Sequence, residues 1–138
     1  MIFFAITSLL LIALLQLKSL ALSEWYVSHD GIFHLVRAKT FENMLKLGYF
    51  PVRWGAQLDN NFGIPVFNYI YPGPYYLSSL LQFINIPAAW ALKFWIAIAY
   101  LLGALGIFIL FRKRNLYFAW IVSLLYLLTP YHFLNFFV

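Results

Sequence analysis

The fold is decided by residues 88–111, which have the sequence AAWALKFWIAIAYLLGALGIFILF. Lys93, near the start, is the one charged residue in this stretch, and the basic run Arg112-Lys113-Arg114 follows it directly. A helix needs about 20 apolar residues to cross a hydrocarbon core of about 30 Å. Residues 88–111 meet that requirement and therefore predict a transmembrane helix.

Two further apolar stretches predict transmembrane helices at 1–22 and 116–138. The first has one cation near its end, Lys18, whose long side chain is able to reach the headgroups. A cleaved signal peptide is the less favoured interpretation of 1–22, because no basic segment precedes the apolar run. The stretch 116–138 contains Pro130, where we expect a kink or the start of a loop. It reaches the last residue without a cap or charged tail, so we expect a truncated part of a longer polytopic chain.

Residues 74–87 form a shorter apolar segment that favours a short membrane helix or a re-entrant segment. The positive-inside rule places Arg112-Lys113-Arg114 in the cytoplasm, and a cytoplasmic amino terminus places 23–73 outside. These two statements agree only if 74–87 does not cross the bilayer completely. Whether the segment crosses therefore stays open at this point.

The composition of the 138 residues supports a membrane protein, with 64% hydrophobic, 22% aromatic and 9% charged residues. A soluble domain has about 25% charged residues, so an ordinary globular protein is excluded. The net charge of +5 is too thinly spread to favour nucleic acid as a partner, and without cysteine there is no disulfide framework. We therefore predict an all-α, integral, multi-pass protein of the cell (inner/cytoplasmic) membrane with three to four transmembrane helices and membrane lipid as a partner.

Residues 23–73 form the predicted extracytoplasmic loop, which contains eight of the charged residues. In a chain this poor in charge, such a loop is where function is expected. Its composition predicts an amphipathic helix at about 30–47, with Ser28 or Asp30 as N-cap and Gly48 as terminator. One side of this helix carries polar residues that we expect to form a solvated face, namely Lys39, Glu42, Asn43 and Lys46.

The opposite side carries an acid, an imidazole and a guanidinium in one stripe, formed by Asp30, His34, Arg37 and Phe41. Phe33, Met44 and Leu45 flank this stripe. A buried polar group without a partner costs about 1–3 kcal/mol, so the stripe indicates either a local network within the helix or a functional site. We predict no cofactor. No metal-binding motif is present, and a divalent metal completed by Asp59 or by a part outside the chain stays open.

Beyond the helix, Arg53 and Trp54 lie side by side in an irregular segment. Arg53 is a candidate for binding a substrate phosphate, and Trp54 offers a flat surface to a sugar or an isoprenoid. The alternative is an anchor at the membrane interface, where Trp, Tyr and Arg are frequent. The same interface favours a belt formed by Tyr69, Tyr71, Tyr75 and Tyr76, in which Tyr71 is the candidate sugar or lipid contact.

An ordered set of short motifs follows the first apolar stretch: SHDGIFHLVR (28–37), GYFPVRW (48–54), FGIPVF (62–67) and YPGPYYL (71–77). Together they resemble the start of polytopic bacterial and archaeal membrane proteins of GT-C-like architecture. That group includes membrane proteins linked to lipoteichoic acid glycosylation and proteins with a so-called 6-pyruvoyl-tetrahydropterin-synthase-related membrane domain. The resemblance covers residues 1 to about 135, and members of the family are several times longer.

The resemblance implies a glycosyltransferase that uses a polyprenyl-phosphate sugar donor and a cell-envelope acceptor. By position Asp30 resembles the family's catalytic base in the first extracytoplasmic loop. His34 would then orient Asp30 or the acceptor, and Arg37 and Arg53 would face the phosphate of the departing lipid. A second interpretation from another class is a non-catalytic membrane scaffold or lipid-binding module.

Overall fold

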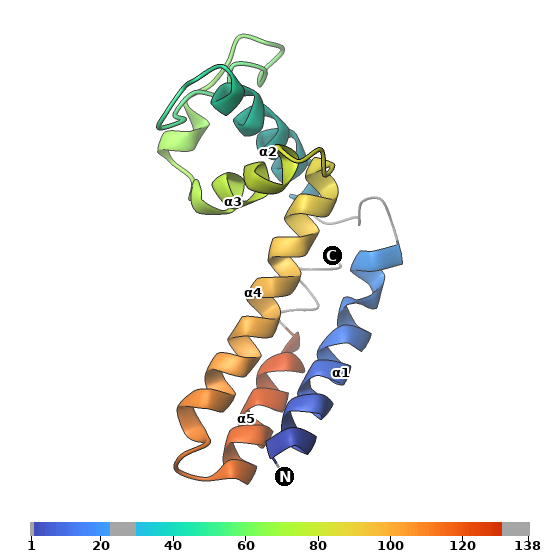
Figure 1. Cartoon of the computed structure of the whole chain (residues 1–138). Coiled ribbons are helices and arrows are strands. Elements are labelled where there is room, and N and C mark those ends of the chain that lie inside the picture. The colour runs from blue at the N-terminus through green and yellow to red at the C-terminus, as the bar shows by residue number, and fades with distance from the viewer. Residues whose placement is uncertain (1, 23–29, 131–138) are drawn as a thin grey trace. The chain divides into compact units, whose positions relative to one another are not determined.

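The computed structural model of the chain describes residues 2–22 and 30–130, and it is helical (Figure 1). In order, the elements are α1 (Ile2–Leu22), α2 (Gly31–Lys46), a short 3-10 helix η1 (Val66–Asn68), α3 (Gly73–Gln82), α4 (Ala88–Phe111) and α5 (Leu116–Leu127). Within the described residues no strand forms, and Gly55 and Ile64 make an isolated β-bridge. The predicted all-α class is confirmed.

The chain divides into two compact units. The first, called the helical unit here, comprises Met1–Ser28 and Ile96–Val138, and the second, called the loop unit, comprises His29–Trp95. The helix α4 contributes its first residues to the loop unit and the rest to the helical unit.

The core of the helical unit follows a four-residue period along α1. Ala5, Leu9, Ala13 and Leu17 are buried, and they pack with residues of α4 and α5, namely Tyr100, Ala104, Phe108, Ala119 and Leu127. Side chains four residues apart form one ridge on a helix, and such ridges fit between those of a neighbouring helix. The alanines keep these ridges low, which allows close packing of the helix backbones.

Four polar side chains of the helical unit, Ser8, Gln16, Tyr100 and Trp120, are paired inside it. The Tyr100 hydroxyl lies 2.5 Å from Gln16 Oε1 and 2.6 Å from the Leu127 carbonyl oxygen. Gln16 Nε2 donates to the same carbonyl over 3.1 Å, and Trp120 Nε1 donates to Ser8 Oγ over 2.9 Å. The exterior is instead rich in exposed large apolar side chains, among them Phe3, Leu15, Leu102, Leu110 and Leu125.

In the described part of the chain, α4 is the one helix that is both long enough, at 24 residues, and apolar enough to cross a membrane. The apolar helical stretches Ile2–Lys18 and Leu116–Leu127 are shorter. The helix expected over 116–138 ends at Leu127, three residues before Pro130. Residues 131–138 of that prediction lie outside the described residues.

The segment expected at 74–87 contains the ten-residue helix α3, with Pro74 in its first turn. At about 1.5 Å per residue such a helix is about 15 Å long, roughly half of the hydrocarbon thickness. After α3 the backbone turns through Asn85, which has a φ of 66°, and α4 starts directly after Pro87.

The loop unit is organised around the ring of Phe41, which is completely buried in α2. The Phe67 ring of η1 and the Tyr76 ring of α3 meet it edge-on at centroid distances of 4.8 and 4.6 Å. The Tyr75 ring lies 5.8 Å from it. Aromatic pairs in this geometry gain about 0.5–1.5 kcal/mol beyond burial of their surface, so this cluster fastens α2, η1 and α3 together.

Candidate functional site

The helix α2 begins one residue after Asp30 and ends at Lys46, in agreement with the helix predicted at about 30–47. Asp30 occupies the N-cap position, but its side chain makes no capping hydrogen bond and is exposed. The other predicted N-cap, Ser28, lies outside the described residues. The carboxylate of Asp30 is therefore accessible at the first turn of α2.

Gly48 terminates α2 as predicted. Its φ of 87° is left-handed, and its N–H donates to the Leu45 carbonyl over 2.9 Å. The next N–H, of Tyr49, donates to the Met44 carbonyl over 3.1 Å. This arrangement pairs carbonyls that the end of a helix leaves without partners, and glycine adopts the required φ without a steric penalty.

His34 is joined to α3 by Tyr75. The His34 Nδ1 atom and the Tyr75 hydroxyl lie 2.8 Å apart, and the two rings are stacked with centroids 6.2 Å apart. Tyr75 itself is buried, so the interfacial position predicted for it is wrong. A helix-wheel argument on α2 missed Tyr75 because the partner lies 41 residues away in the sequence.

The charges of Asp30 and Arg37 both act on His34. Partial burial of the imidazole and the nearby Arg37 guanidinium lower the pKa of His34 below its usual 6.5, while Asp30 partly opposes them. Asp30 and His34 are largely exposed and Arg37 is half-buried, so the full penalty for a buried polar group does not apply to this stripe, although partial burial still lowers the pKa of His34. The structure instead brings three predicted site residues together with Tyr75, and we call these four residues the His34 cluster.

The polar face expected at Lys39, Glu42, Asn43 and Lys46 is not fully solvated. The Glu42 side chain is only 1% exposed, and it accepts hydrogen bonds from Lys39 at 2.7 Å and Lys46 at 2.5 Å. Burial raises the pKa of Glu42, but the hydrogen bonds and charges of the two lysines outweigh it and the net pKa is lowered. Glu42 therefore carries a buried charge with two partners, and its prediction as a solvated residue is wrong.

The remaining predicted site residues lie in the segment between α2 and α3. The Trp54 indole covers Gly63, where an added Cβ would collide with it, and Arg53 and Tyr71 are exposed. Among the described residues no hydrogen bond, ion pair or ring contact joins Arg53, Trp54 or Tyr71 to the His34 cluster. Their roles in binding a phosphate, a sugar or a lipid stay predictions.

A metal centre was left open by the sequence. Within residues 2–22 and 30–130 no three His, Asp or Glu side chains gather in a way that would hold a metal ion. Asp59, the predicted additional ligand, is exposed in a tight turn where its φ is 51°. The divalent metal stays an open prediction.

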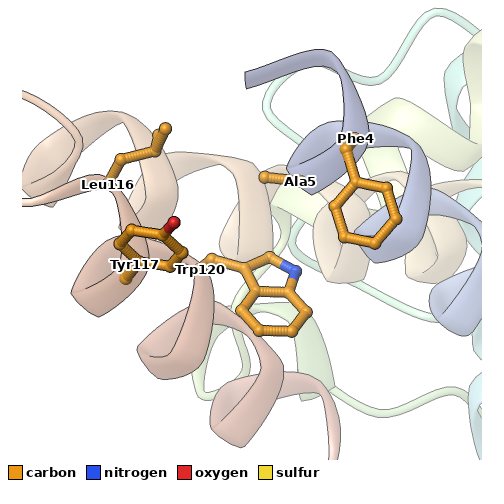
Figure 2. A pocket seen from close by; sticks show the side chains of 5 residues that line it. All are labelled: Phe4, Ala5, Leu116, Tyr117 and Trp120. Carbon is orange, nitrogen blue, oxygen red and sulfur yellow. The ribbon is translucent and has the colours of Figure 1, made fainter. Parts of the chain in front are cut away.

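A small apolar hollow of about 200 Å³ lies in the helical unit (Figure 2). It is lined by Phe4, Ala5, Leu116, Tyr117 and Trp120. The rings of Phe4 and Trp120 have centroids 6.4 Å apart. Small-molecule sites usually have volumes of about 300–1,000 Å³ and a few convergent polar groups, so the His34 cluster is the stronger candidate site.

The His34 cluster thus offers an accessible carboxylate, a largely neutral imidazole with a fixed partner, and a cation within one compact unit. Comparisons of the chain with protein-family models, with curated proteins and with solved structures find no match.

Proposed function

We propose that the chain is part of a multi-pass integral membrane protein in which α1, α4 and α5 lie in the bilayer. The support is the apolar exterior of the helical unit, where large apolar side chains face outward while polar groups such as Gln16, Tyr100 and Ser8 pair inside. In water such a surface would favour aggregation, whereas lipid solvates it at no cost. The loop unit would then lie outside the cytoplasm, beside the membrane.

Within this frame the function best supported is that of a GT-C-like glycosyltransferase. It would move a sugar from a polyprenyl-phosphate carrier to a cell-envelope acceptor. The observation that carries this proposal is the accessible Asp30 carboxylate at the start of α2, close to His34 and Arg37. A base and a cation that are fixed on one helix are suited to a reaction that removes a proton and releases a phosphate.

The reaction would proceed by direct displacement at the anomeric carbon. The acceptor hydroxyl oxygen forms the new bond to that carbon while Asp30 takes the hydroxyl proton. The bond to the carrier phosphate breaks, and the phosphate leaves with the electron pair toward the Arg37 guanidinium. His34, held by Tyr75, would orient the acceptor, because its lowered pKa keeps the imidazole neutral.

The substitution Asp30→Asn in the full-length protein tests this proposal. The amide has nearly the same shape but cannot take the proton, and general bases contribute about 10²–10⁴-fold to a rate. We expect at least about a 100-fold loss of sugar transfer from a polyprenyl-phosphate donor, measured in reconstituted membranes.

The matched control is Asn61→Asp, which exchanges the same two side chains in reverse at an exposed turn of the loop unit. Asp tolerates the left-handed φ of 69° at this position, so the fold should be kept. Unchanged transfer by Asp30→Asn, with the control also active, would refute the catalytic role and favour the non-catalytic scaffold.

A further inference from the structure

The segment between α2 and α3 exposes several aromatic side chains. Phe50 is 80%, Phe62 81%, Tyr69 83% and Tyr71 89% exposed. A single exposed apolar residue on a surface is ordinary, whereas several in one short segment indicate an interaction surface. We call these four residues the aromatic anchors.

The backbone that carries the aromatic anchors has a defined shape. Gly55 and Ile64 form an antiparallel bridge with N···O distances of 2.8 and 3.3 Å. Between them Asp59, Asn60 and Asn61 are consecutively left-handed, and the Trp54 indole lies over Gly63. A surface that is ordered before binding loses less entropy when it binds.

The inner side of the same segment is attached to the helices. The Val52 N–H donates to the Tyr76 hydroxyl over 3.3 Å, and Phe67 packs against the buried Phe41. The Phe50 ring contacts the Tyr76 ring at 5.8 Å but is otherwise exposed. The aromatic anchors are therefore the aromatic side chains of this segment that the fold of the loop unit leaves at least 80% exposed.

The charge of this surface favours phosphate groups. Arg53 lies in the same segment as the aromatic anchors, is exposed and forms no ion pair with any described residue. Lys39 and Lys46 of α2 differ, because both are engaged by Glu42. Tyr and Phe side chains beside an unpaired Arg match the level of lipid headgroups, where aromatic rings partition and anionic phosphates attract cations.

We propose that the loop unit docks on the surface of the bilayer through the aromatic anchors, which are inserted at headgroup level, and through Arg53, which binds lipid phosphates. This proposal rests on membrane residence of the protein but not on sugar transfer. Docking would hold the loop unit beside the lipid from which a lipid-linked substrate must be taken.

Spin labelling tests this proposal, because a cysteine introduced into these 138 residues is the single one among them. Phe62→Cys and Tyr71→Cys would be labelled in the full-length protein in vesicles of phosphatidylcholine and phosphatidylglycerol. The control is Gln57→Cys, because Gln57 is an exposed polar residue whose Oε1 atom accepts from Asn43 Nδ2 of α2 at 2.8 Å. Collision with O₂, which concentrates in lipid, is compared with collision with a water-soluble nickel chelate.

We expect collisions with O₂ to exceed those with the nickel chelate at positions 62 and 71, and the reverse at position 57. Greater access for the nickel chelate at 62 and 71 would mean that the aromatic anchors face water and would overturn the proposal. Poor access for both reagents would mean that protein covers them and would overturn it equally. Sugar transfer by the labelled variants is a separate measurement, so this proposal and the proposed function fail independently.

The contribution of Arg53 is tested by Arg53→Gln in the Tyr71→Cys protein. Without the guanidinium we expect the label at position 71 to lie nearer to water in vesicles with phosphatidylglycerol, and Arg53→Lys to restore its depth. An unchanged depth in Arg53→Gln would remove Arg53 from the docking surface.

Discussion

His34 is the residue of the candidate site that contacts α3 and whose pKa depends on two neighbouring charges. Its ring is held by Tyr75 of α3. Arg37 lowers the pKa of His34, and Asp30 raises it. A neutral imidazole is both a donor and an acceptor, whereas the protonated ring only donates. The balance of the two neighbouring charges therefore decides which hydrogen bonds His34 offers to a ligand.

This balance predicts how the pKa of His34 responds to substitution. Arg37→Gln should raise it, because a repelling cation is removed, and Asp30→Asn should lower it, because an attracting anion is removed. Histidine NMR signals followed against pH in micelles measure the change, with His34→Gln to assign the signal.

The same shift has a consequence for stability. Because the folded protein holds the pKa of His34 below 6.5, its neutral form contributes stability above pH 6.5. That contribution is lost as the pH falls below 6.5 through the folded pKa.

Movement of the His34 pKa in the same direction in Arg37→Gln and Asp30→Asn would contradict the electrostatic account.

At the scale of elements, the packing of α4 against α5 depends on one glycine. A Cβ on Gly103 would collide with the Tyr126 hydroxyl and lie 2.7 Å from its Cζ, whereas a Cβ on Gly106 meets nothing within 4 Å. Tyr126 is a ring rather than a flexible chain, and it is also in contact with the Tyr100 ring at 6.2 Å. The ring therefore has little freedom to move aside.

We expect Gly103→Ala to destabilise the helical unit by about 1–3 kcal/mol, the usual cost of overpacking. Gly106→Ala is the matched control in the same helix and should be neutral or slightly stabilising, because alanine favours helix over glycine. Thermal unfolding in detergent compares the two, and equal midpoints would show that Tyr126 does not restrict position 103.

Elements with strong local signals could be predicted from the sequence. The long apolar run, with Lys93 as its one charged residue, predicted the bounds of α4, and Asp30 and Gly48 marked the two ends of α2 correctly. The partners of α2 could not be predicted, because burial of a helical side chain depends on which element packs against it. This is why Glu42 was assigned to solvent and the buried Tyr75 to an interface.

At the scale of the whole molecule, the length of α3 bears on topology. A helix of ten residues is too short to cross alone, so α4 would be the single crossing between the loop unit and the basic turn at Arg112-Lys113-Arg114. That arrangement satisfies the positive-inside rule, with the loop unit outside and the turn in the cytoplasm. The conflict left open by the sequence would then disappear.

Single cysteines test this topology. A membrane-impermeant maleimide should label Gln57→Cys in intact cells, and should label Lys113→Cys only after the cells are permeabilised. Labelling of both positions in intact cells would contradict the single crossing and would mean that the segment containing α3 crosses the bilayer as well.

The apolar exterior of the helical unit has a consequence for protein engineering. Its specificity lies in paired groups such as Gln16, Tyr100 and Ser8, which are already inside, so none of them has to change to obtain a water-soluble version. Only outward-facing side chains need to be substituted, with Glu, Lys or Arg in place of Phe3, Leu15, Leu102, Leu110 and Leu125. If the helical unit lies in the bilayer as proposed, its interior would suit lipid and water alike, and the outward-facing side chains alone would decide between the two solvents.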